Sequence, residues 1–424
     1  MTTSVWRQQP CGRKTVNNIL SGLRVIESSA FVAVPMAGMT LSQMGAEVIR
    51  FDRLEGGLDA RRMPYSPSGS SLFWSGMNKG KKSIAVDMKN PEGKDLITNL
   101  ITAPGKDAGL FLTNLKVKGW LDYETLSELR SDIIIVTLKG DRQGRPQVDY
   151  TVNPALGIPE ITGHEGSIEP VANAIPAWDM IAGNMCVSSL LAAERYRLRH
   201  GVGQDVEIAL KDVAAAAIGH LGMIADSTLN TDDRSKAGNA LYGAYGKDFL
   251  CADGNRVMII GLTSRQWSGI LKATDTTEQF KNLENEKNIN LKDEATRWKW
   301  RDEITAILEP WFKTRAVEDF ARDFDNTGLT WSVFRSVKEA LEFDPDLSED
   351  NPLFKKIKQP EAGEFLVPRH PANFSKVDNT EAKGAPALGE HTEEILGDIL
   401  HLSDIEISNL FDKGVVASPT YNKN

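Results

Sequence analysis

The stretch Ser83-Ile-Ala-Val-Asp-Met-Lys-Asn-Pro-Glu-Gly-Lys-Asp-Leu-Ile-Thr-Asn-Leu-Ile-Thr102 decides the fold of this chain. Its first residues form a short apolar run that is typical of a buried strand, which we expect over 83–87. Asn90 and Pro91 then favour a helix start, because an asparagine side chain caps free amides and proline fits the first helical position. The spacing predicts a helix over 91–102. One strand followed by one helix is the repeating unit of an α/β fold.

The same alternation extends in both directions from this stretch. We expect further strands at 23–27, 47–51, 109–113 and 133–138, and helices at 36–44 and 123–129, the last with Asp122 as its cap. Strands that alternate with helices are usually parallel and joined by right-handed crossovers. The sequence therefore predicts an α/β fold with a doubly wound parallel sheet.

The turn after the first strand limits the ligands that this sheet can bind. It reads Ser28-Ser-Ala-Phe-Val-Ala-Val-Pro35 and contains no G-x-G-x-x-G. A nicotinamide or flavin site is therefore disfavoured. Ligands of doubly wound sheets still bind beyond the carboxyl ends of the strands.

The length of 424 residues allows two or three domains. Residues 140–175 are polar and rich in glycine and proline, so we expect loops there, followed by a strand at 205–210 and one helix over 211–225. Composition changes at 226–238, which indicates a linker to a smaller α+β domain that begins with a hairpin around Asp253-Gly-Asn255. We divide the chain into an N-terminal extension (1–20), a large domain (21–225), a small domain (226–344) and a C-terminal part (345–424).

Composition argues against several classes of protein. Lysine and arginine number 49 against 58 acidic residues, giving a net charge of -9, so we expect neither nucleic acid nor a membrane as partner. Residues 1–20 lack the apolar core of a signal peptide, and 177–193 is too short to span a bilayer. The cysteines (Cys11, Cys186 and Cys251) and the six histidines show no ligand spacing, so we expect no metal. A cytoplasmic location fits, and Cys186 and Cys251 are typical of core positions.

Asp179 is the candidate nucleophile. It follows Pro176 and Trp178 at the start of a long apolar run, in the first turn of a helix that we expect to end near Arg199. The helix dipole and the free amides would hold this carboxylate ionised, and apolar neighbours would remove its water and increase its reactivity. The alternative is an ordinary acid at a helix start that satisfies free amides and does nothing more.

Basic residues recur at the ends of the expected strands. A phosphate-rich ligand would need such a rim at the carboxyl edge of the sheet, whereas a solvated basic surface is the alternative. The residues concerned are Arg53, Lys79, Lys81, Lys82, Lys89, Lys116, Lys118 and Lys139.

Seven short motifs, in order, resemble the family III CoA-transferases over residues 20–415. They are Leu23-Arg-Val-Ile-Glu27, Met44-Gly-Ala-Glu-Val-Ile-Arg50, Asn78-Lys-Gly-Lys-Lys-Ser-Ile-Ala-Val-Asp87, Asn90-Pro-Glu-Gly93, Gly201-Val-Gly-Gln-Asp-Val206, Tyr242-Gly-Ala-Tyr245 and Leu388-Gly-Glu-His-Thr392. The resemblance implies an interlocked homodimer with a large Rossmann-like CoA-binding domain, to which the C-terminal part returns. It also implies an acyl-CoA substrate and no separate cofactor.

The resemblance carries roles onto individual residues. Asp179 matches the family nucleophile, and the CoA contacts map onto Val32, Arg53, Val86, Lys89, Asn114, Leu115 and Lys139. The loop after Asn114 is about four residues shorter than in formyl-CoA transferases and lacks an expected arginine, so Lys116 and Lys118 are the candidates to replace it. The turn at 30–34 is a candidate source of backbone donors for the oxyanion.

Further stretches favour one reaction within the family. Ala103-Pro-Gly-Lys-Asp-Ala-Gly-Leu-Phe-Leu-Thr-Asn114, Asp149-Tyr-Thr-Val-Asn-Pro154 and Gly219-His-Leu-Gly-Met-Ile-Ala225 resemble the branch that moves CoA between the C1 and C4 carboxyl groups of mesaconyl-CoA. An intermolecular CoA-transferase is the alternative. An α-methylacyl-CoA racemase is disfavoured, since its base histidine would fall near Val148. A CoA-binding scaffold without activity is a third alternative. Candidates for the distal carboxylate are Arg61, Arg62 and Lys247.

Overall fold

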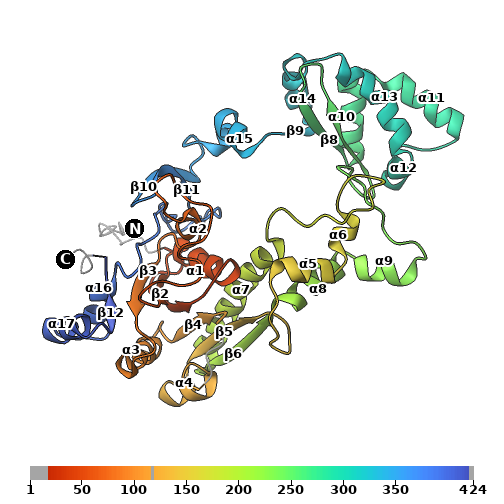
Figure 1. The fold of residues 1–424 in the computed structure, drawn as a ribbon. Helices are drawn as coiled ribbons and strands as arrows, with labels where there is room; N and C mark the ends of the chain where they lie inside the picture. The colour runs from red at the N-terminus through yellow and green to blue at the C-terminus, as the bar shows by residue number, and fades with distance from the viewer. Residues whose placement is uncertain (1–17, 116–118, 420–424) are drawn as a thin grey trace, which may run out of the picture. The chain divides into compact units, whose positions relative to one another are not determined.

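The computed structural model describes residues 18–115 and 119–419 (Figure 1). Most of the predicted N-terminal extension, together with Cys11, Lys116 and Lys118, lies outside the described residues. The chain forms two compact units. The first contains the chain up to Val152, Ile175–Gly222 and the chain from Pro345 onward, and the second contains Asn153–Ala174 and Met223–Asp344. Residues 153–174 and 223–225, which we expected in the large domain, thus group with the second unit.

A seven-stranded sheet forms the centre of the first unit, in the order β12-β3-β2-β1-β4-β5-β6. Its strands are β1 (Arg24–Ser28), β2 (Glu47–Asp52), β3 (Lys82–Val86), β4 (Leu110–Thr113), β5 (Ile134–Lys139), β6 (Gln204–Ala209) and β12 (Val416–Ala417). The first six are parallel, and β12 pairs antiparallel with β3. The predicted α/β class with a doubly wound sheet is confirmed. The strand order reverses between β1 and β4, which makes their carboxyl ends the switch point of the fold.

Local signals position the helices around this sheet. The side chain of Asn90 accepts a hydrogen bond from the amide of Glu92, and that of Asp122 accepts one from Thr125, as their predicted capping roles require. The helices of this unit are α1 (Ala33–Gln43), α2 (Leu72–Met77), α3 (Pro91–Thr102), α4 (Tyr123–Leu129), α7 (Ala177–His200), α8 (Leu210–His220), α16 (Thr392–Asp398) and α17 (Asp404–Asp412).

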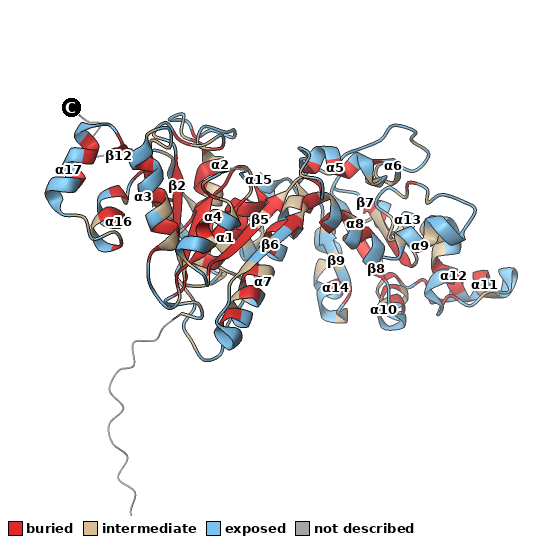
Figure 2. Cartoon of the chain, turned by 90° about the horizontal axis from the view of Figure 1, so that it is seen from below, coloured by how far each residue is buried: buried red, intermediate tan, exposed pale blue. Residues whose placement is uncertain are grey.

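The C-terminal helices complete the core of the sheet. Ile395 and Leu396 from α16, and Leu410 and Phe411 from α17, belong to one buried cluster with strand residues such as Ile84. In Figure 2 the residues coloured as buried lie along the strands of this sheet. The short hairpin β10 (Phe354–Gln359) and β11 (Gly363–Pro368) precedes these helices.

Two sequence expectations were wrong. Residues 140–175 contain α5 (Asp149–Ala155) and α6 (Ile158–Ile161) in addition to loops, and the short length of both helices and the proline within α5 hid their periodicity. The single helix expected at 211–225 is divided into α8 and α9 (Met223–Leu229). Gly222 lies at the break and has a φ of 75°. Glycine adopts this left-handed conformation at little cost because it has no Cβ atom, so helices often end at such a residue.

The second unit is the expected α+β domain. Its sheet has the antiparallel order β7-β8-β9, and a glycine with a φ of 81°, Gly254, turns the predicted hairpin. Aromatic side chains, including Trp267, Phe280 and Phe312, fill its core. Besides α6 and α9, its elements include β7 (Tyr245–Leu250), β8 (Arg256–Gly261), α10 (Ser264–Thr274), α11 (Thr277–Lys287), α12 (Glu294–Lys299), α13 (Arg301–Lys313), α14 (Ala321–Thr327), β9 (Thr330–Val333) and α15 (Val337–Phe343).

The structure bears on two expectations from composition, the state of the cysteines and the presence of membrane-spanning helices. Cys186 and Cys251 are both buried and unbonded, as their sequence context predicted. Across the part of the chain that the structure describes, no helix has the length and apolarity needed to cross a membrane.

A buried arginine, Arg50, connects three parts of the first unit. Its guanidinium donates to Asp52 at 2.8 Å, to Asp59 at 2.8 Å and to the backbone carbonyl of Ser29 at 3.1 Å. The side chain is 1% exposed and lies over the ring of Trp74. The neighbouring Glu27 accepts from Lys81 at 2.8 Å, so acids and bases alternate through this interior. Arg50 thereby joins the end of β1, the end of β2 and the segment after β2.

Replacing Arg50 with methionine should destabilise the first unit strongly. The substitution leaves the carboxylates of Asp52 and Asp59 buried without their cation, which typically costs about 3–5 kcal/mol. Arg24 is the matched control, since its ion pair with Glu47 is partly exposed and Arg24→Met should cost at most about 1 kcal/mol. Urea unfolding of both variants measures the difference. Equal losses would contradict a central role for Arg50.

Candidate active site

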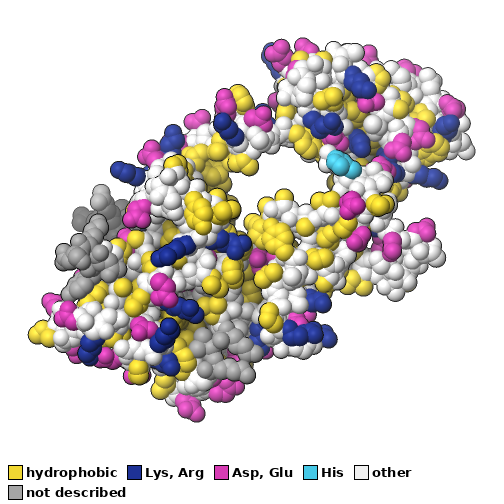
Figure 3. Space-filling model, viewed as in Figure 1, with side chains coloured by type: hydrophobic (Ala, Val, Ile, Leu, Met, Phe, Trp, Pro, Cys, Tyr) yellow, Lys and Arg dark blue, Asp and Glu magenta, His cyan; other side chains and the backbone are white. Residues whose placement is uncertain are grey.

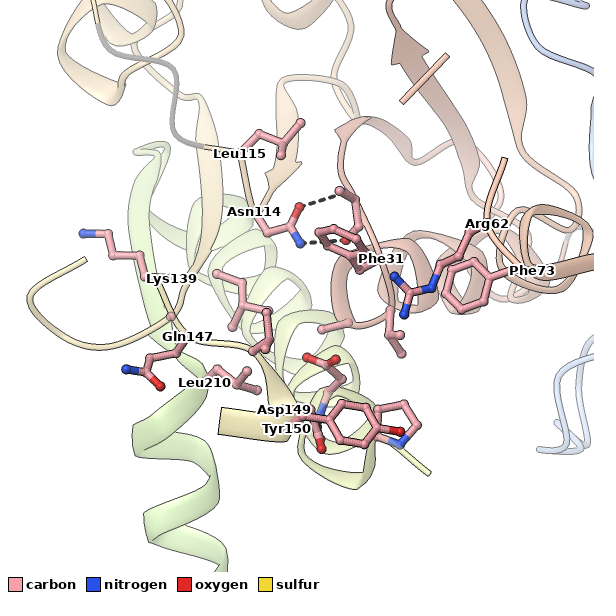
Figure 4. Close-up of a pocket in the computed structure, with 18 of the residues that line it drawn as sticks. Phe31, Arg62, Phe73, Asn114, Leu115, Lys139, Gln147, Asp149, Tyr150 and Leu210 are labelled. Carbon is pink, nitrogen blue, oxygen red and sulfur yellow. Dashed lines mark hydrogen bonds between the residues drawn. The ribbon is translucent and has the colours of Figure 1, made fainter. Parts of the chain in front are cut away.

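A cavity of about 490 Å³ opens at the switch point of the sheet (Figure 4). Its walls come from the segments that follow β1, β2, β4 and β5, together with the start of α7, all within the first unit. The lining residues include Phe31, Val32, Arg62, Phe73, Asn114, Leu115, Lys139, Val148, Asp149 and Asp179. The cavity lies where a doubly wound sheet binds its ligands.

Asp179 lies in the first turn of α7 and lines this cavity. Trp178 beside it is buried, as expected for a core side chain. Burial and the negative charge of Asp149 raise the pKa of Asp179, the positive charge of Arg62 opposes them, and the resulting pKa is about 6. A desolvated carboxylate with this pKa is still mostly ionised at neutral pH and is a better nucleophile than a hydrated one.

The expectation that free helix amides hold Asp179 ionised is wrong. The carboxylate of Asp149 accepts hydrogen bonds from the amides of Trp178 at 2.7 Å and Asp179 at 3.2 Å, so a residue thirty positions earlier caps α7. The pKa of Asp149 is itself raised by burial, and the two amides counteract that effect. Asp149 therefore uses the donors that the sequence suggested for Asp179.

The turn after β1 forms the wall that adjoins α1. The amide group of Asn114 accepts from the backbone N–H of Ala30 at 2.9 Å and donates to its carbonyl at 2.8 Å (Figure 4). Phe31 has a φ of 67°, a left-handed conformation that is strained for a bulky residue. The helix α1 begins at Ala33, and the amides of its first turn have no partner within the helix. Ala30 is thus removed from the candidate oxyanion donors, and the amides that follow remain.

A glycine brings α7 close to α1. A Cβ atom at Gly183 would lie 2.7 Å from the carbonyl oxygen of Ala33 and 2.7 Å from the terminal methyl of Met36. Real Cβ contacts of that length essentially never occur, so the two helices approach only because position 183 has no side chain. Gly183 lies one helical turn after Asp179, and this contact fixes the distance from the nucleophile to the turn after β1.

Arg62 lines the cavity with an exposed side chain that contacts two aromatic rings. Its guanidinium lies 5.3 Å from the ring centre of Phe31 and 5.1 Å from that of Phe73. Figure 4 shows the three side chains at one side of the cavity. Within residues 18–115 and 119–419, the structure gives this guanidinium no carboxylate partner.

The structure brings together only part of the predicted CoA contacts. Val32, Asn114, Leu115 and Lys139 line the cavity with Asp179, although the ammonium group of Lys139 forms an ion pair with Glu207. Three others do not line it: Val86 is buried in the core, and Arg53 and Lys89 are exposed beyond their strands. Lys116 and Lys118 lie outside the described residues.

Other basic residues from the sequence analysis have structural surroundings. Lys81 is buried on Glu27, Lys79 is buried, and Lys82 pairs with Glu47 and Glu394. Of the three candidates for the distal carboxylate, only Arg62 lines the cavity. Arg61 is exposed outside it, and Lys247 lies on β7 in the second unit.

A second cavity of about 540 Å³ shares the wall formed by residues 138–140 and 147–148. It is also lined by Gly144, Arg145, Pro146 and Thr151. Exposed apolar side chains, among them Met63, Leu115, Val148 and Tyr150, border the first cavity. Such side chains are common on the face shown in Figure 3. The two cavities offer a long, largely apolar path from the surface to Asp179.

Sequence reasoning missed the aromatic pair and the cap. Phe31 and Phe73 belong to no periodic pattern that predicts a site, and the cap by Asp149 joins residues far apart in the chain. Asp149 carried one usable signal, since it begins the stretch Asp149-Tyr-Thr-Val-Asn-Pro154 that resembles the family. Among residues 18–115 and 119–419, no three His, Cys, Asp or Glu side chains are arranged as metal ligands.

Comparison with known proteins identifies the family. A family model described as CoA-transferase family III matches residues 20–392. The chain is 50% identical over 405 residues to 2-methylfumaryl-CoA isomerase from Chloroflexus aurantiacus, which covers 95% of this chain and 99% of that protein. Human succinyl-CoA:glutarate CoA-transferase is 27% identical over 427 residues, with coverage of 97% and 93%. A crystal structure of a CAIB/BAIF family protein from Brucella suis shares the fold, with a TM-score of 0.74 and 24% identity over 90% of this chain and 99% of that one. The chain therefore belongs to CoA-transferase family III.

Proposed function

We propose that this protein is a 2-methylfumaryl-CoA isomerase, an enzyme that moves CoA between the C1 and C4 carboxyl groups of mesaconyl-CoA. The observation that carries the proposal is 50% identity to such an isomerase over 99% of its length. The cavity at the switch point, with a desolvated aspartate in its wall, supports CoA transfer through a covalent intermediate.

Asp179 performs the nucleophilic step in this proposal. Its carboxylate attacks the C1 thioester carbonyl, which breaks the C–S bond and gives a mixed anhydride and CoA thiolate. The thiolate attacks the aspartyl carbonyl and releases mesaconate, leaving an aspartyl-CoA thioester. The C4 carboxylate then attacks the aspartyl carbonyl of this thioester, expels the CoA thiolate and forms a second mixed anhydride. The thiolate attacks the C4 carbonyl of this anhydride, which gives the C4 isomer and releases the carboxylate of Asp179. Retention of mesaconate between the two halves keeps the transfer intramolecular.

Backbone and side-chain groups of the cavity support these steps. We assign stabilisation of the developing oxyanions to the first-turn amides of α1, since the amide of Ala30 already donates to Asn114. We assign CoA contacts to Val32, Asn114, Leu115 and Lys139, which line the cavity. Arg53 and Lys89, exposed beyond β2 and β3, remain candidates for more distant contacts, whereas Val86 is fully buried and offers CoA no surface. The apolar border of the cavity suits the pantetheine arm. CoA enters as part of the substrate, so the proposal includes no separate cofactor.

The proposal extends to assembly and setting. We place the enzyme in the cytoplasm as a homodimer, in glyoxylate assimilation by the 3-hydroxypropionate bicycle. Exposed apolar side chains on α7, among them Met180, Ile181 and Met185, are typical of a surface that a second subunit covers.

An intermolecular CoA-transferase is the second candidate. The relative named succinyl-CoA:glutarate CoA-transferase, at 27% identity, favours this alternative. The two functions differ in whether a second acid is required.

Mesaconyl-C1-CoA alone should be converted to the C4 isomer. Because the same diacid supplies both carboxyl groups, added isotopically labelled mesaconate should not enter the product. Mass spectrometry of the separated isomers measures both results. A strict requirement for a second acid, or full exchange with the labelled pool, would favour the intermolecular transferase.

Asp179→Asn should reduce isomerisation by at least about 10³-fold, because an amide cannot form the anhydride. In the wild type, hydroxylamine during turnover should convert Asp179 to its hydroxamate, which peptide mass spectrometry detects. Above pH 6 the variant should melt no lower than the wild type, since a carboxylate with a raised pKa costs stability when it ionises. Asp404→Asn, in the first turn of α17, is the control and should keep full activity. A hydroxamate elsewhere would exclude Asp179 as the nucleophile.

The rate should depend on pH through the ionisation of Asp179. The pKa of about 6 predicts that kcat/KM rises with pH through about 6 and is level above it. Asp149→Asn removes the neighbouring negative charge while its amide oxygen still caps α7, so the pKa of Asp179 should fall and the rise should move to lower pH. Activity profiles from pH 4.5 to 8.5 test this, and a shift to higher pH would refute the assigned coupling.

A further inference from the structure

The unpartnered cation of the cavity is Arg62. Two cationic side chains, Arg62 and Lys139, occur among the described residues that line the cavity. The ammonium group of Lys139 already has a carboxylate partner, Glu207. The guanidinium of Arg62 lies over the rings of Phe31 and Phe73, and within the described residues it forms no ion pair with a carboxylate, although its charge acts on Asp179. Arg62 is therefore the cation that remains for an anionic ligand.

Within the described residues, the side-chain N–H donors of Arg62 form no hydrogen bond, and contact with the two rings does not require them. A guanidinium is planar, and its N–H donors lie in that plane, so rings that cover its faces do not use its donors. The edge of such a group binds a carboxylate through two parallel hydrogen bonds. The guanidinium of Arg50 differs in this respect, because its N–H groups already donate hydrogen bonds to Asp52, Asp59 and Ser29.

Several contacts hold Arg62 and its aromatic neighbours in position. The backbone carbonyl of Arg62 accepts from the hydroxyl of Ser71 at 2.6 Å, at the start of the helix that carries Phe73. The left-handed backbone of Phe31 follows Ala30, whose N–H and carbonyl are both bonded to Asn114. Strain that the surroundings maintain in this way is typical of functional sites. The anchored backbone and the ring contacts restrain Arg62, so its side chain loses less conformational entropy on binding a ligand than a freely moving arginine would.

We propose that Arg62, in contact with Phe31 and Phe73, determines specificity by binding the free carboxylate of a dicarboxylic acyl group. This inference rests on the proposed function and names the recognition element of the same site. Arg62 lines the same cavity as Asp179, and its charge acts on that carboxylate, so both side chains are available to one acyl group in this cavity. A neutral acyl chain leaves the guanidinium without a partner.

Matched ligands test the proposal. Tiglyl-CoA carries a methyl group where mesaconyl-C1-CoA carries its free carboxylate, and butyryl-CoA has the same relation to succinyl-CoA. Binding is measured by calorimetry in the Asp179→Asn protein, which blocks turnover. The dicarboxylic member of each pair should bind about 10- to 100-fold more tightly, in line with hydrogen bonds to a charged group. Adding Arg62→Met should reduce this ratio to about 1, and Arg62→Lys should restore only part of it.

Arg61→Met is the matched control. Arg61 is the adjacent, exposed arginine outside the cavity, and its removal should leave the ratio unchanged. Phe73→Leu should give an intermediate ratio, because one face of the guanidinium loses its ring. With Asp179 present, Arg62→Met should lower kcat/KM for mesaconyl-CoA more than it lowers the trapping rate with tiglyl-CoA, since loss of the Arg62 charge raises the pKa of Asp179 equally for both ligands.

The outcomes separate this inference from the proposed function. An unchanged ratio in Arg62→Met, or an equal loss of binding for both members of a pair, overturns the role of Arg62 even if the enzyme isomerises mesaconyl-CoA. The absence of any preference for dicarboxylic ligands overturns it as well. Conversely, an Arg62-dependent preference for succinyl-CoA in a protein that does not isomerise mesaconyl-CoA supports the role of Arg62 and refutes the isomerase.

Discussion

The buried guanidinium of Arg50 is the interaction on which the cavity depends. It binds the carbonyl of Ser29, directly before the turn that carries Phe31, and the carboxylate of Asp59, three residues before Arg62. Two of the cavity's walls are therefore attached to one cation in the interior. Burying this charge is tolerable only because several acceptors surround it. The motifs ending at Glu27 and Arg50, and the one starting at Asn78, supply members of this network. Motifs that revealed the family thus have a structural role.

The environment of Asp179 reflects two opposing effects. A helix N-terminus lowers the pKa of a carboxylate, and removal of water raises it. Here Asp149 accepts the amide hydrogen bonds, and desolvation dominates at Asp179. The resulting pKa of about 6 leaves the group ionised at neutral pH while its water shell is reduced. The same helix start therefore serves two acids, one as a cap and the other as a reactive group.

Local signals explain which parts of the molecule the sequence predicted. The strands, the helix at 91–102 and the caps Asn90 and Asp122 follow from neighbouring residues, and the structure contains all of them. Asp179 was found from its position in the chain and from the family motifs. The cap by Asp149 and the ring contacts of Arg62 were not predicted. Each joins residues that are far apart in the sequence and that only the tertiary structure brings into contact. Lys79 and Lys81, which precede β3, were included among the candidates for a phosphate-binding rim. Both are buried, and Lys81 pairs with Glu27, which the charge pattern of the sequence does not reveal.

The absence of a side chain at Gly183 has a consequence for how this site can diversify. The backbone of α7 at Gly183 lies so close to the backbone of α1 that any side chain at position 183 would collide with it. Substitutions there cannot alter the size of this side of the cavity in small steps. The opposite walls, at 62–73 and 147–150, consist of side chains that substitution can enlarge or shorten. A homologous enzyme that accepts a larger or smaller acyl group should therefore differ along those two segments, while the helix pair that carries the nucleophile keeps its geometry.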